Sequence, residues 1–494
     1  MSENRTTYKA IFKATSLFGS VHIVNVIISI IRSKFLAILI GPEGYGIFGL
    51  LNSTVDIVRR ALGLSIETSG VKKISQAYTS KNQKSIVKES TIIFWIAIIT
   101  GFLGSIISVL FSKQLSYFTF GDYNMTMAIA LVGVTILFKQ LTEAQSAIMQ
   151  GVTKLKFLAK SGLYGNVIGL FITLPLFYLF GLDAIVPAII ISSFLNYLVS
   201  YFYFRRLKIK VSLNFSTRVL KEGKEIIVFG GLLTLGSFLP VLVNYLMQIY
   251  IRYLGDIESV GLFSVGLVML NAYVGVIFIA MSTEYYPRLA GFNKNIKLEN
   301  EAVNQQAIVS MLIIVPVIVG FLFFKDLVIK LLFSKDFILV LPMLVWAVPA
   351  MLFKAVSWSL GYLIIARADS AVFVKTAVVY NAIYFVLCAG GYYFGEMKGL
   401  GIGLCIFYFL HLVGNYIVTS LRYGVQCSRV LIKIFIISFL LCSLSFLLCD
   451  LENLIYRYLT FIVIFSITIF YSYYEIDKRI DVKSLLAKYI KKKK

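Results

Sequence analysis

Residues that bind metals or form disulfides are scarce in this sequence. Histidine occurs only twice, at His22 and His411, and no two of the five cysteines form a Cys-x-x-Cys pair. The cysteines lie in the last quarter of the chain, mostly within apolar runs, as small buried side chains do. We therefore predict no metal site, no disulfide framework and no cofactor.

Charged residues are also few, at 14% of the 494 residues, whereas 59% are hydrophobic. Apolar stretches long enough to cross a bilayer as helices recur along the whole chain. The net charge of +23 lies in short basic segments at their ends, where it meets anionic inner-leaflet lipids. We predict an all-α integral membrane protein, and nucleic acid is not an expected partner.

The apolar stretches predict about fourteen transmembrane helices. Lysine and arginine concentrate in the termini and in alternate connections, and only six lie in the opposite connections: Lys113, Arg252, Lys325, Lys330, Lys335 and Lys398. The positive-inside rule then predicts a multi-pass protein of the cell inner (plasma) membrane with both termini cytoplasmic. The spans run at roughly 15–40, 44–70, 90–112, 125–150, 157–180, 183–204, 225–254, 258–286, 303–324, 337–365, 371–394, 399–421, 430–449 and 453–474.

An internal repeat divides the chain. "LIGPEGYGIFGLL" (39–51) recurs as "YLGDIESVGLFSVGL" (253–267), with Gly41 matching Gly255, and "YLFGLDAIVPAI" (178–189) recurs as "YYFGEMKGLGIGL" (392–404). Six spans separate the members of each pair, so the halves share one orientation, as in transporters built from parallel repeats. We predict an N-lobe at 1–204, a cytoplasmic linker at 205–224, a C-lobe at 225–421, two added helices within 430–474, and a basic tail at 475–494 that either lies on the anionic leaflet or is solvated.

The first repeated segment contains Gly44-Tyr-Gly-Ile-Phe-Gly49, which spells the G-x-G-x-x-G of a dinucleotide-binding turn. That fingerprint requires a preceding strand and a soluble β-α-β unit, and here it follows a membrane helix. We predict that Gly41-Pro42 ends the first span and that the later glycines let the first two spans pack closely. No nucleotide site is expected.

Lysines lie near the middle of the fourth span of each half. Lys139 and Lys354 both follow Leu-Phe and lie 215 residues apart. Charges at membrane depth usually face a cavity, so this pair suits a central cavity that attracts an anion. Lys139 has Glu143 one turn away as an alternative partner, whereas Lys354 has no acid within four residues and has Trp358 one turn away.

The second span adds further charges. Asp56 can reach either Arg59 or Arg60, and because the two arginines point about 100° apart, at least one remains free for a diphosphate. Arg32 in the first span is a further cation. Asp56, Glu143 and His411 are candidates for ion coupling, although histidines in such helices more often hydrogen-bond a neighbouring helix. Five prolines are expected to kink their spans: Pro175, Pro187, Pro240, Pro316 and Pro349.

The segment "LAILIGPEGYGIFGLL", the six-plus-six-plus-two layout and the symmetric basic residues resemble the polysaccharide-transporter family. That family includes Wzx-type O-antigen flippases and belongs to the MOP superfamily with MATE exporters and MurJ-type lipid II flippases. The resemblance implies the MATE-like fold and translocation of an undecaprenyl-diphosphate-linked oligosaccharide for lipopolysaccharide or another surface polysaccharide. It also implies a polysaccharide polymerase and chain-length machinery as partners. The residues expected to hold the diphosphate and sugars are Lys354, Lys139, Arg59, Arg60, Arg32 and Trp358.

Two other functions are weighed against this one. A MATE-like exporter of organic cations predicts acidic rather than basic groups in the cavity. A membrane polymerase or glycosyltransferase predicts a large extramembrane loop and paired carboxylates, and the sequence contains neither. We therefore expect a transporter with no catalytic residues.

Overall fold

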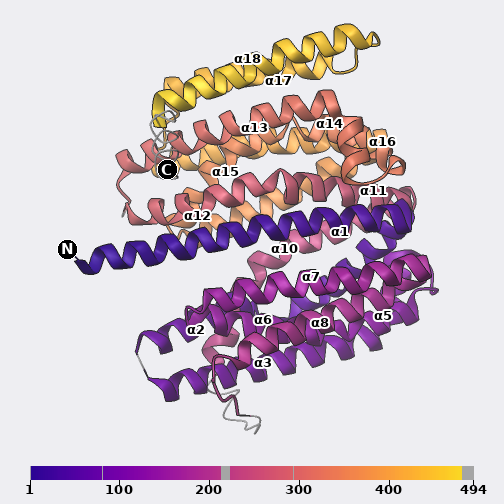
Figure 1. The fold of residues 1–494 in the computed structure, drawn as a ribbon, viewed down its shortest axis with the longest axis vertical. Coiled ribbons are helices and arrows are strands. Elements are labelled where there is room, and N and C mark those ends of the chain that lie inside the picture. Colours follow the sequence, from indigo (N-terminus) through magenta and orange to yellow (C-terminus); the bar gives the residue numbers. More distant parts are fainter. Residues whose placement is uncertain (1, 81, 213–222, 293, 481–494) are drawn as a thin grey trace, which may run out of the picture. The chain divides into compact units, whose positions relative to one another are not determined.

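The computed structural model describes the backbone of residues 2–80, 82–212, 223–292 and 294–480, and every regular element in these ranges is a helix (Figure 1). Side chains are described for the same residues except 2–23, 235, 272–273, 276, 279–284 and 480. The predicted all-α fold is confirmed. Half of the predicted linker, residues 213–222, and most of the basic tail, residues 481–494, lie outside the described residues.

Contacts divide the chain into two compact units. Unit 1 contains Met1–Ser264 and Leu332–Phe337, and unit 2 contains Val265–Leu331 and Ile338–Lys494. The lobe boundaries expected from the repeat stay a prediction. The helices that begin in unit 1 are α1 (Ser2–Leu62), α2 (Ile66–Thr79), α3 (Gln83–Leu110), α4 (Ser112–Phe120), α5 (Thr126–Gly133), α6 (Thr135–Gly151), α7 (Leu155–Phe180), η1 (Gly181–Ala184), α8 (Ile185–Arg205), α10 (Lys224–Leu254) and α11 (Ile257–Val268).

Unit 2 continues the helical pattern with one π-turn. Its short elements are η2 (Met269–Tyr273), which is the π-turn, and α14 (Leu341–Ala347), which follows η3 (Lys335–Val340). Its long helices are α12 (Gly275–Gly291), α13 (Ile296–Leu332), α15 (Met351–Ala366), α16 (Ser370–Tyr423), α17 (Arg429–Leu448) and α18 (Leu454–Ile480).

The described residues contain eight helical segments long and apolar enough to cross a membrane, or up to ten if each of two bent pairs is one span. Three of the segments each cover two predicted spans and are interrupted inside, so the segments are consistent with fourteen spans. The interruptions lie at Gly41, at η1 after Gly181, and at Gly395-Glu396. Gly181 and Gly395 occupy matching positions of the repeat, and both have backbone angles outside the helical range.

Three predicted spans are broken or bent, two of them next to a predicted proline kink, whereas α7 and α13 continue without a break at Pro175 and Pro316. The span at 44–70 was predicted as one helix, and this is wrong, because α1 ends at Leu62 and Leu64 and Ser65 have left-handed backbone angles. The span at 337–365 bends by 58° between α14 and α15, next to Pro349 as predicted. In α10 a bend of 43° lies one turn before Pro240. A proline ring clashes with the carbonyl group four residues earlier in a helix, which accounts for the position of this bend.

The repeated glycines pack two turns of unit 1 against each other. A Cβ on Gly46 would lie 2.1 Å from the Ile257 carbonyl oxygen, and a Cβ on Gly261 would lie 1.9 Å from the Pro42 carbonyl oxygen. The prediction that these glycines bring the first two spans together is wrong for Gly46, because its partner is the matching turn of the repeat. Gly41, with φ of 62°, ends the first span as predicted.

Replacing Gly261 with alanine is expected to destabilise unit 1. The new methyl group overlaps backbone, which cannot move aside as a side chain can, so we expect a loss of about 1–3 kcal/mol. Gly162→Ala is the matched control, since that glycine lies in α7 with no atom within 4 Å of the added Cβ. The test is thermal unfolding in detergent, and equal melting temperatures for both variants would contradict the prediction.

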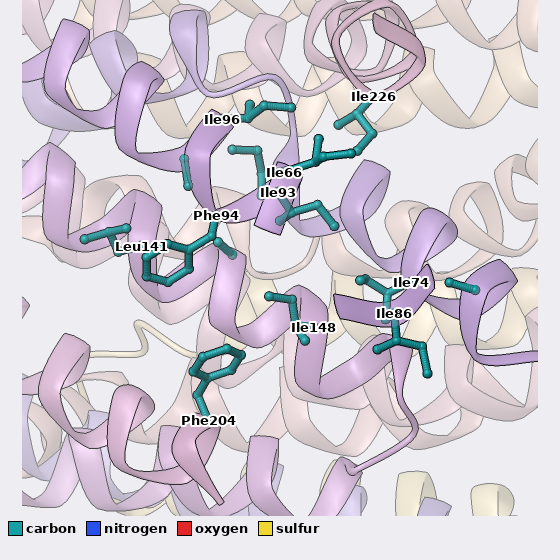
Figure 2. Close-up of a cluster of buried hydrophobic side chains, with 14 of the residues drawn as sticks. Ile66, Ile74, Ile86, Ile93, Phe94, Ile96, Leu141, Ile148, Phe204 and Ile226 are labelled. Atoms are coloured by element: carbon teal, nitrogen blue, oxygen red, sulfur yellow. The ribbon is translucent and has the colours of Figure 1, made fainter. Parts of the chain in front are cut away.

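The core of unit 1 is an isoleucine-rich cluster that α2, α3, α6, α8 and α10 share (Figure 2). Ile66 and Ile74 of α2 are fully buried, and Ile226 from the start of α10 belongs to the same cluster. Phe94 of α3 stacks on Phe204 of α8 with ring centroids 6.3 Å apart. This core holds the segment after the break in α1 firmly against α6, which carries Lys139 and Glu143.

Unit 2 contains the longest helical segment after α1. Its α16 folds at Gly395-Glu396, and close approach of Gly391 and Gly399 lets its two halves pack, since a Cβ on either would lie within about 2.2 Å of the other's carbonyl oxygen. The two halves of α16 pack on α14 and α15. This packing positions Lys354 and His411. All five cysteines are free thiols.

Candidate functional site

The charged residues of unit 1 gather where α1 breaks. Arg59 and Arg60 lie in the last turn before Leu62, where the helix dipole favours cations. A Cβ on Gly63 would lie 2.6 Å from the Arg59 carbonyl oxygen and 2.7 Å from Nε2 of Gln140, so the break requires a glycine against α6. The sequence offers no proline or glycine pair here, which is why the break was not predicted.

Four charges form one network beside this break. Arg59 donates from Nε to Oδ1 of Asp56 at 3.2 Å and from Nη1 to Oε1 of Glu143. Lys139 donates from Nζ to the same Asp56 oxygen at 3.3 Å. Arg59 is only 9% exposed, so its charge is stabilised by carboxylates rather than by water. The network therefore joins the end of α1 to α6.

The pairing differs in part from the prediction. Asp56 contacts Arg59, as expected, but the expected alternative pair of Lys139 with Glu143 is wrong, because each finds its partner on α1. Arg60 makes no hydrogen bond or ion pair with a residue that the structure describes, so it is the arginine left available. Together Arg59 and Lys139 balance Asp56 and Glu143, and this network has no surplus charge.

A hydroxyl cluster on the other side of the break was missed by sequence reasoning. Ser65 Oγ lies 3.2 Å from Oγ1 of Thr234 and 3.3 Å from Oγ of Ser237, both on α10. A Cβ on Gly230 would meet the Leu64 carbonyl oxygen at 2.1 Å, so α10 passes close to the break. Isolated hydroxyls in apolar helices are too common to single these out from the sequence.

Lys354 in unit 2 contacts no carboxylate of a described residue. Its Nζ donates to Oδ1 of Asn271 at 3.2 Å and lies 5.7 Å from the Phe278 ring centroid and 5.3 Å from that of Tyr408. Asn271 belongs to the π-turn η2, a distortion frequent at functional sites. No ion pair joins Lys354 to any part of the chain that the structure describes.

The two lysine contacts are related by the repeat. Lys139 and Lys354 lie 215 residues apart, and so do their partners Asp56 and Asn271. The first half therefore pairs lysine with a carboxylate, and the second half pairs it with a neutral amide. At the same offset Glu143 corresponds to Trp358. The second half therefore has the lysine but neither acid, and the repeat offset applied to Asp56 would have identified Asn271 from the sequence.

Trp358 lies in an aromatic group beside Lys354. Its ring centroid is 4.3 Å from that of Tyr362 and 5.6 Å from that of Phe278. Tyr286 of α12 adds a ring 6.2 Å from Tyr362. Tyr286 is 40% exposed, and Trp358 and Tyr362 are half-buried, so ring faces and hydroxyls are available here.

His411 belongs to a polar network inside unit 2. Its Nδ1 lies 2.5 Å from Ser357 Oγ, and its ring packs on Tyr380 with centroids 4.4 Å apart. Asn415, which is 2% exposed, donates to the Ser357 carbonyl oxygen and accepts from the Tyr380 hydroxyl. These bonds join α15 to both halves of α16, which favours the interhelical role for His411. Its ion-coupling role stays a prediction.

Arg32, the weakest of the predicted cations, lies in the first span. Its guanidinium carbon is 5.9 Å from the Phe48 ring centroid, and it makes no ion pair with a described residue. The unit 1 network does not include it. The side chain of His22 is not among those that the structure describes.

A second group of charges lies at the turn between α15 and α16. Arg367 donates to both carboxylate oxygens of Glu299, which is 2% exposed. Asp369 caps α16 by accepting from the Val372 amide at 3.3 Å, and it accepts from Arg422 Nε at 2.7 Å. The hydrogen bond from Arg422 holds the pKa of Asp369 below its usual range.

This lowered pKa predicts a pH dependence of stability. A carboxyl with a folded pKa below its unfolded value stabilises the fold above the unfolded pKa of about 3.9, and the contribution disappears as pH falls through the folded pKa. Asp369→Asn is therefore expected to melt a few degrees below wild type at pH 7 and to converge with it in strong acid. The measurement is melting temperature against pH in detergent, with Asp122→Asn, an exposed aspartate in another loop, as the control. A constant difference at all pH values would contradict the assignment.

Comparisons with known proteins give the family from a family model and the fold from solved structures. A family model described as polysaccharide biosynthesis protein matches residues 35–342. A search of curated proteins finds no match. Lipid II flippase MurJ in an inward closed conformation is similar, with a TM-score of 0.69 and 14% identity over 95% of this chain and 99% of MurJ.

Two further solved structures have the same fold. An inward-facing multidrug-resistance MATE family transporter of the MOP superfamily has a TM-score of 0.64 and 12% identity, covering 85% of this chain and 99% of its own. A MOP superfamily transporter from Pyrococcus furiosus, described as having a binding pocket of reverse polarity, has a TM-score of 0.60 and 14% identity, covering 83% and 96%. The predicted MATE-like fold is confirmed.

Proposed function

Because this chain belongs to the polysaccharide biosynthesis protein family, we propose that it is a flippase for a lipid-linked oligosaccharide. It moves an oligosaccharide carried on undecaprenyl diphosphate from the cytoplasmic to the outer leaflet of the inner membrane by alternating access. O-antigen or another surface-polysaccharide repeat unit is the cargo. Both termini are cytoplasmic, as the distribution of basic residues predicts.

One observation carries this proposal: Lys354 contacts Asn271 at the position where the first half has Asp56. A lysine at membrane depth without a carboxylate partner attracts an anion, since an unpaired charge there is costly. The diphosphate is the anionic part of the proposed cargo. Lys354 is therefore assigned as its principal contact.

The rings next to Lys354 suit the sugars. Aromatic side chains offer apolar faces that pack on the C–H faces of sugar rings, and tyrosine hydroxyls supply hydrogen bonds at the edge. Trp358, Tyr362 and Tyr286 are all accessible in part. In the proposal a sugar contact therefore lies beside a phosphate contact, in the order in which the two groups are linked in the cargo.

The unit 1 network has a different part in the proposal. Arg59 and Lys139 are neutralised by Asp56 and Glu143, so an anion reaches them only by displacing a carboxylate or when a carboxylate takes up a proton. This makes Asp56 and Glu143 the proposed coupling residues, with Arg60 as the cation already available. A proton gradient or the membrane potential is then the driving force.

The two rival functions fit the site less well. An exporter of organic cations needs unpaired carboxylates, whereas the unit 2 site has an unpaired lysine and the unit 1 network is balanced. A polymerase or glycosyltransferase needs an acid and a base at one reacting bond. The carboxylates Asp56 and Glu143 are instead both engaged by Arg59.

The test is complementation of a strain that lacks its own flippase and makes the matching lipid-linked glycan. We expect the wild-type chain to restore surface polysaccharide, with a reporter fused at the C-terminus active in the cytoplasm only. The proposal would be refuted if the lipid-linked intermediate accumulated on the cytoplasmic side with each of several glycans, although the protein was present at normal levels. Resistance to cationic drugs gained in the same strain would favour the exporter.

A further inference from the structure

A basic pocket of about 430 Å³ lies in unit 1 between α2 and the start of α10, on the side predicted to be cytoplasmic. Lys72 and Lys73 of α2 line it together with Lys224 and Glu225 of α10. Lys73 is paired with Glu225, so two lysines remain. The pocket has no role in the networks described above, and its chemistry points to a separate ligand.

The two remaining lysines form no ion pair in the described part of the chain, although Lys72 lies close enough to Glu225, the partner of Lys73, to act on its charge. The Lys72 ammonium lies 4.0 Å from the Phe229 ring centroid, a contact that orients it over the pocket without neutralising it. Lys224 is exposed at the first position of α10 and forms no ion pair with a described residue. The pocket therefore has an excess of two positive charges.

An apolar strip extends from these charges along α10. Lys224, Val228 and Leu232 are four residues apart, so they lie on one face of the helix. Val228 is 56% exposed and Leu232 is 65% exposed, and both line the pocket. Positive charge at one end and exposed apolar side chains along the strip suit an amphiphile with an anionic head. A basic segment that served only topology would need neither a concave site nor this strip.

We propose that this pocket binds a phosphate carried on a lipid chain, with the phosphate between Lys72 and Lys224 and the chain along Val228 and Leu232. The inference rests on the proposed function in one respect, because the lipid-linked diphosphate then docks here before translocation. The phosphate has two possible sources with the same chemistry, the carrier lipid and an ordinary anionic phospholipid.

Native mass spectrometry of the purified chain tests the pocket directly. The probes are undecaprenyl diphosphate, phosphatidylglycerol, phosphatidylcholine with the same acyl chains, and inorganic pyrophosphate. Lys72→Gln/Lys224→Gln is expected to weaken binding of both anionic lipids about tenfold or more, as loss of charge-assisted hydrogen bonds does. Lys156→Gln/Lys160→Gln removes the same charge from exposed positions of α7 and is expected to change binding less than twofold.

A further double variant tests the apolar strip. Val228→Ser/Leu232→Ser is expected to weaken the binding of the lipids but not the binding of pyrophosphate. Equal losses in the two lysine double variants, or lipids that bind no more tightly than pyrophosphate, would overturn the proposal. Preference for undecaprenyl diphosphate identifies the carrier as the ligand, and preference for phosphatidylglycerol identifies a membrane lipid; either supports the pocket. Because this binding needs no transport, a chain that binds lipid here but fails complementation would refute the proposed function and leave the pocket intact.

Discussion

Replacing Lys354 with glutamine is expected to reduce glycan translocation about 10- to 100-fold, the range that corresponds to one charge-assisted hydrogen bond to a phosphate. Glutamine keeps a polar side chain beside Asn271 but removes the only charge that the described residues bring to that site. The measurement is the rate at which surface polysaccharide appears in the complemented strain, normalised to the amount of protein in the membrane. Lys375→Gln is the matched control, because that lysine is exposed on α16.

A second variant tests the same idea without touching the lysine. Asn271→Asp recreates in unit 2 the lysine–carboxylate contact that Lys139 and Asp56 make in unit 1. It is expected to slow translocation nearly as much as Lys354→Gln, because the new carboxylate neutralises the lysine and repels a diphosphate. Lys354→Arg is expected to retain most activity. Full activity of both Lys354→Gln and Asn271→Asp would remove Lys354 from the mechanism.

Replacing Arg59 with glutamine is expected to destabilise the chain by about 3–5 kcal/mol, the usual cost of removing one partner of a buried ion pair. Glu143 loses its hydrogen-bonded cation, and Asp56 keeps only Lys139. The neighbouring change, Arg60→Gln, removes the same group one residue later. Since Arg60 has no ion pair with a described residue, its loss is expected to cost less than about 1 kcal/mol.

The comparison is made by unfolding the purified protein in mixed micelles. Glu143→Gln in the Arg59→Gln background is expected to recover part of the lost stability, because it removes the carboxylate left unpaired. Equal stability of the two arginine variants would show that the Arg59 network does not hold α1 to α6. The two substitutions also separate folding from transport, since Arg60→Gln is expected to reduce translocation in a chain that folds normally.

The two sets of variants test how the charged residues of each unit bind an anion. In unit 2, Lys354 forms no ion pair with a described residue, whereas in unit 1 Arg59 and Lys139 are neutralised by carboxylates. In the proposal an anionic cargo binds Lys354 directly, and it binds Arg59 and Lys139 only when Asp56 or Glu143 is displaced or protonated. Protonation of either acid changes anion binding in unit 1 and not in unit 2, which is the physical basis for coupling in the proposal.

Most of the architecture followed from the sequence because it depends on local chemistry. Long apolar runs form helices in a membrane, since the backbone must satisfy its own hydrogen bonds there. Gly41 ends a helix because glycine readily adopts the positive φ of 62° found there, and Pro349 bends its span because it lacks an amide hydrogen. The repeat and the central position of Lys139 and Lys354 are likewise properties of spacing along the chain.

What the sequence could not decide is which groups meet. Asp56 and Lys139 lie 83 residues apart, and whether they touch depends on how α1 and α6 pack. The break at Leu64 and Ser65 depends on the close approach of Gly63 to α6 and of Gly230 to Leu64. By itself the sequence determined the helices and their repeat and predicted the depth of the charges, because these follow from hydrophobicity and periodicity. Only the tertiary structure decided that Lys139 is neutralised and that Lys354 meets no carboxylate among the described residues, because ion pairing depends on distances of a few ångströms between separate helices.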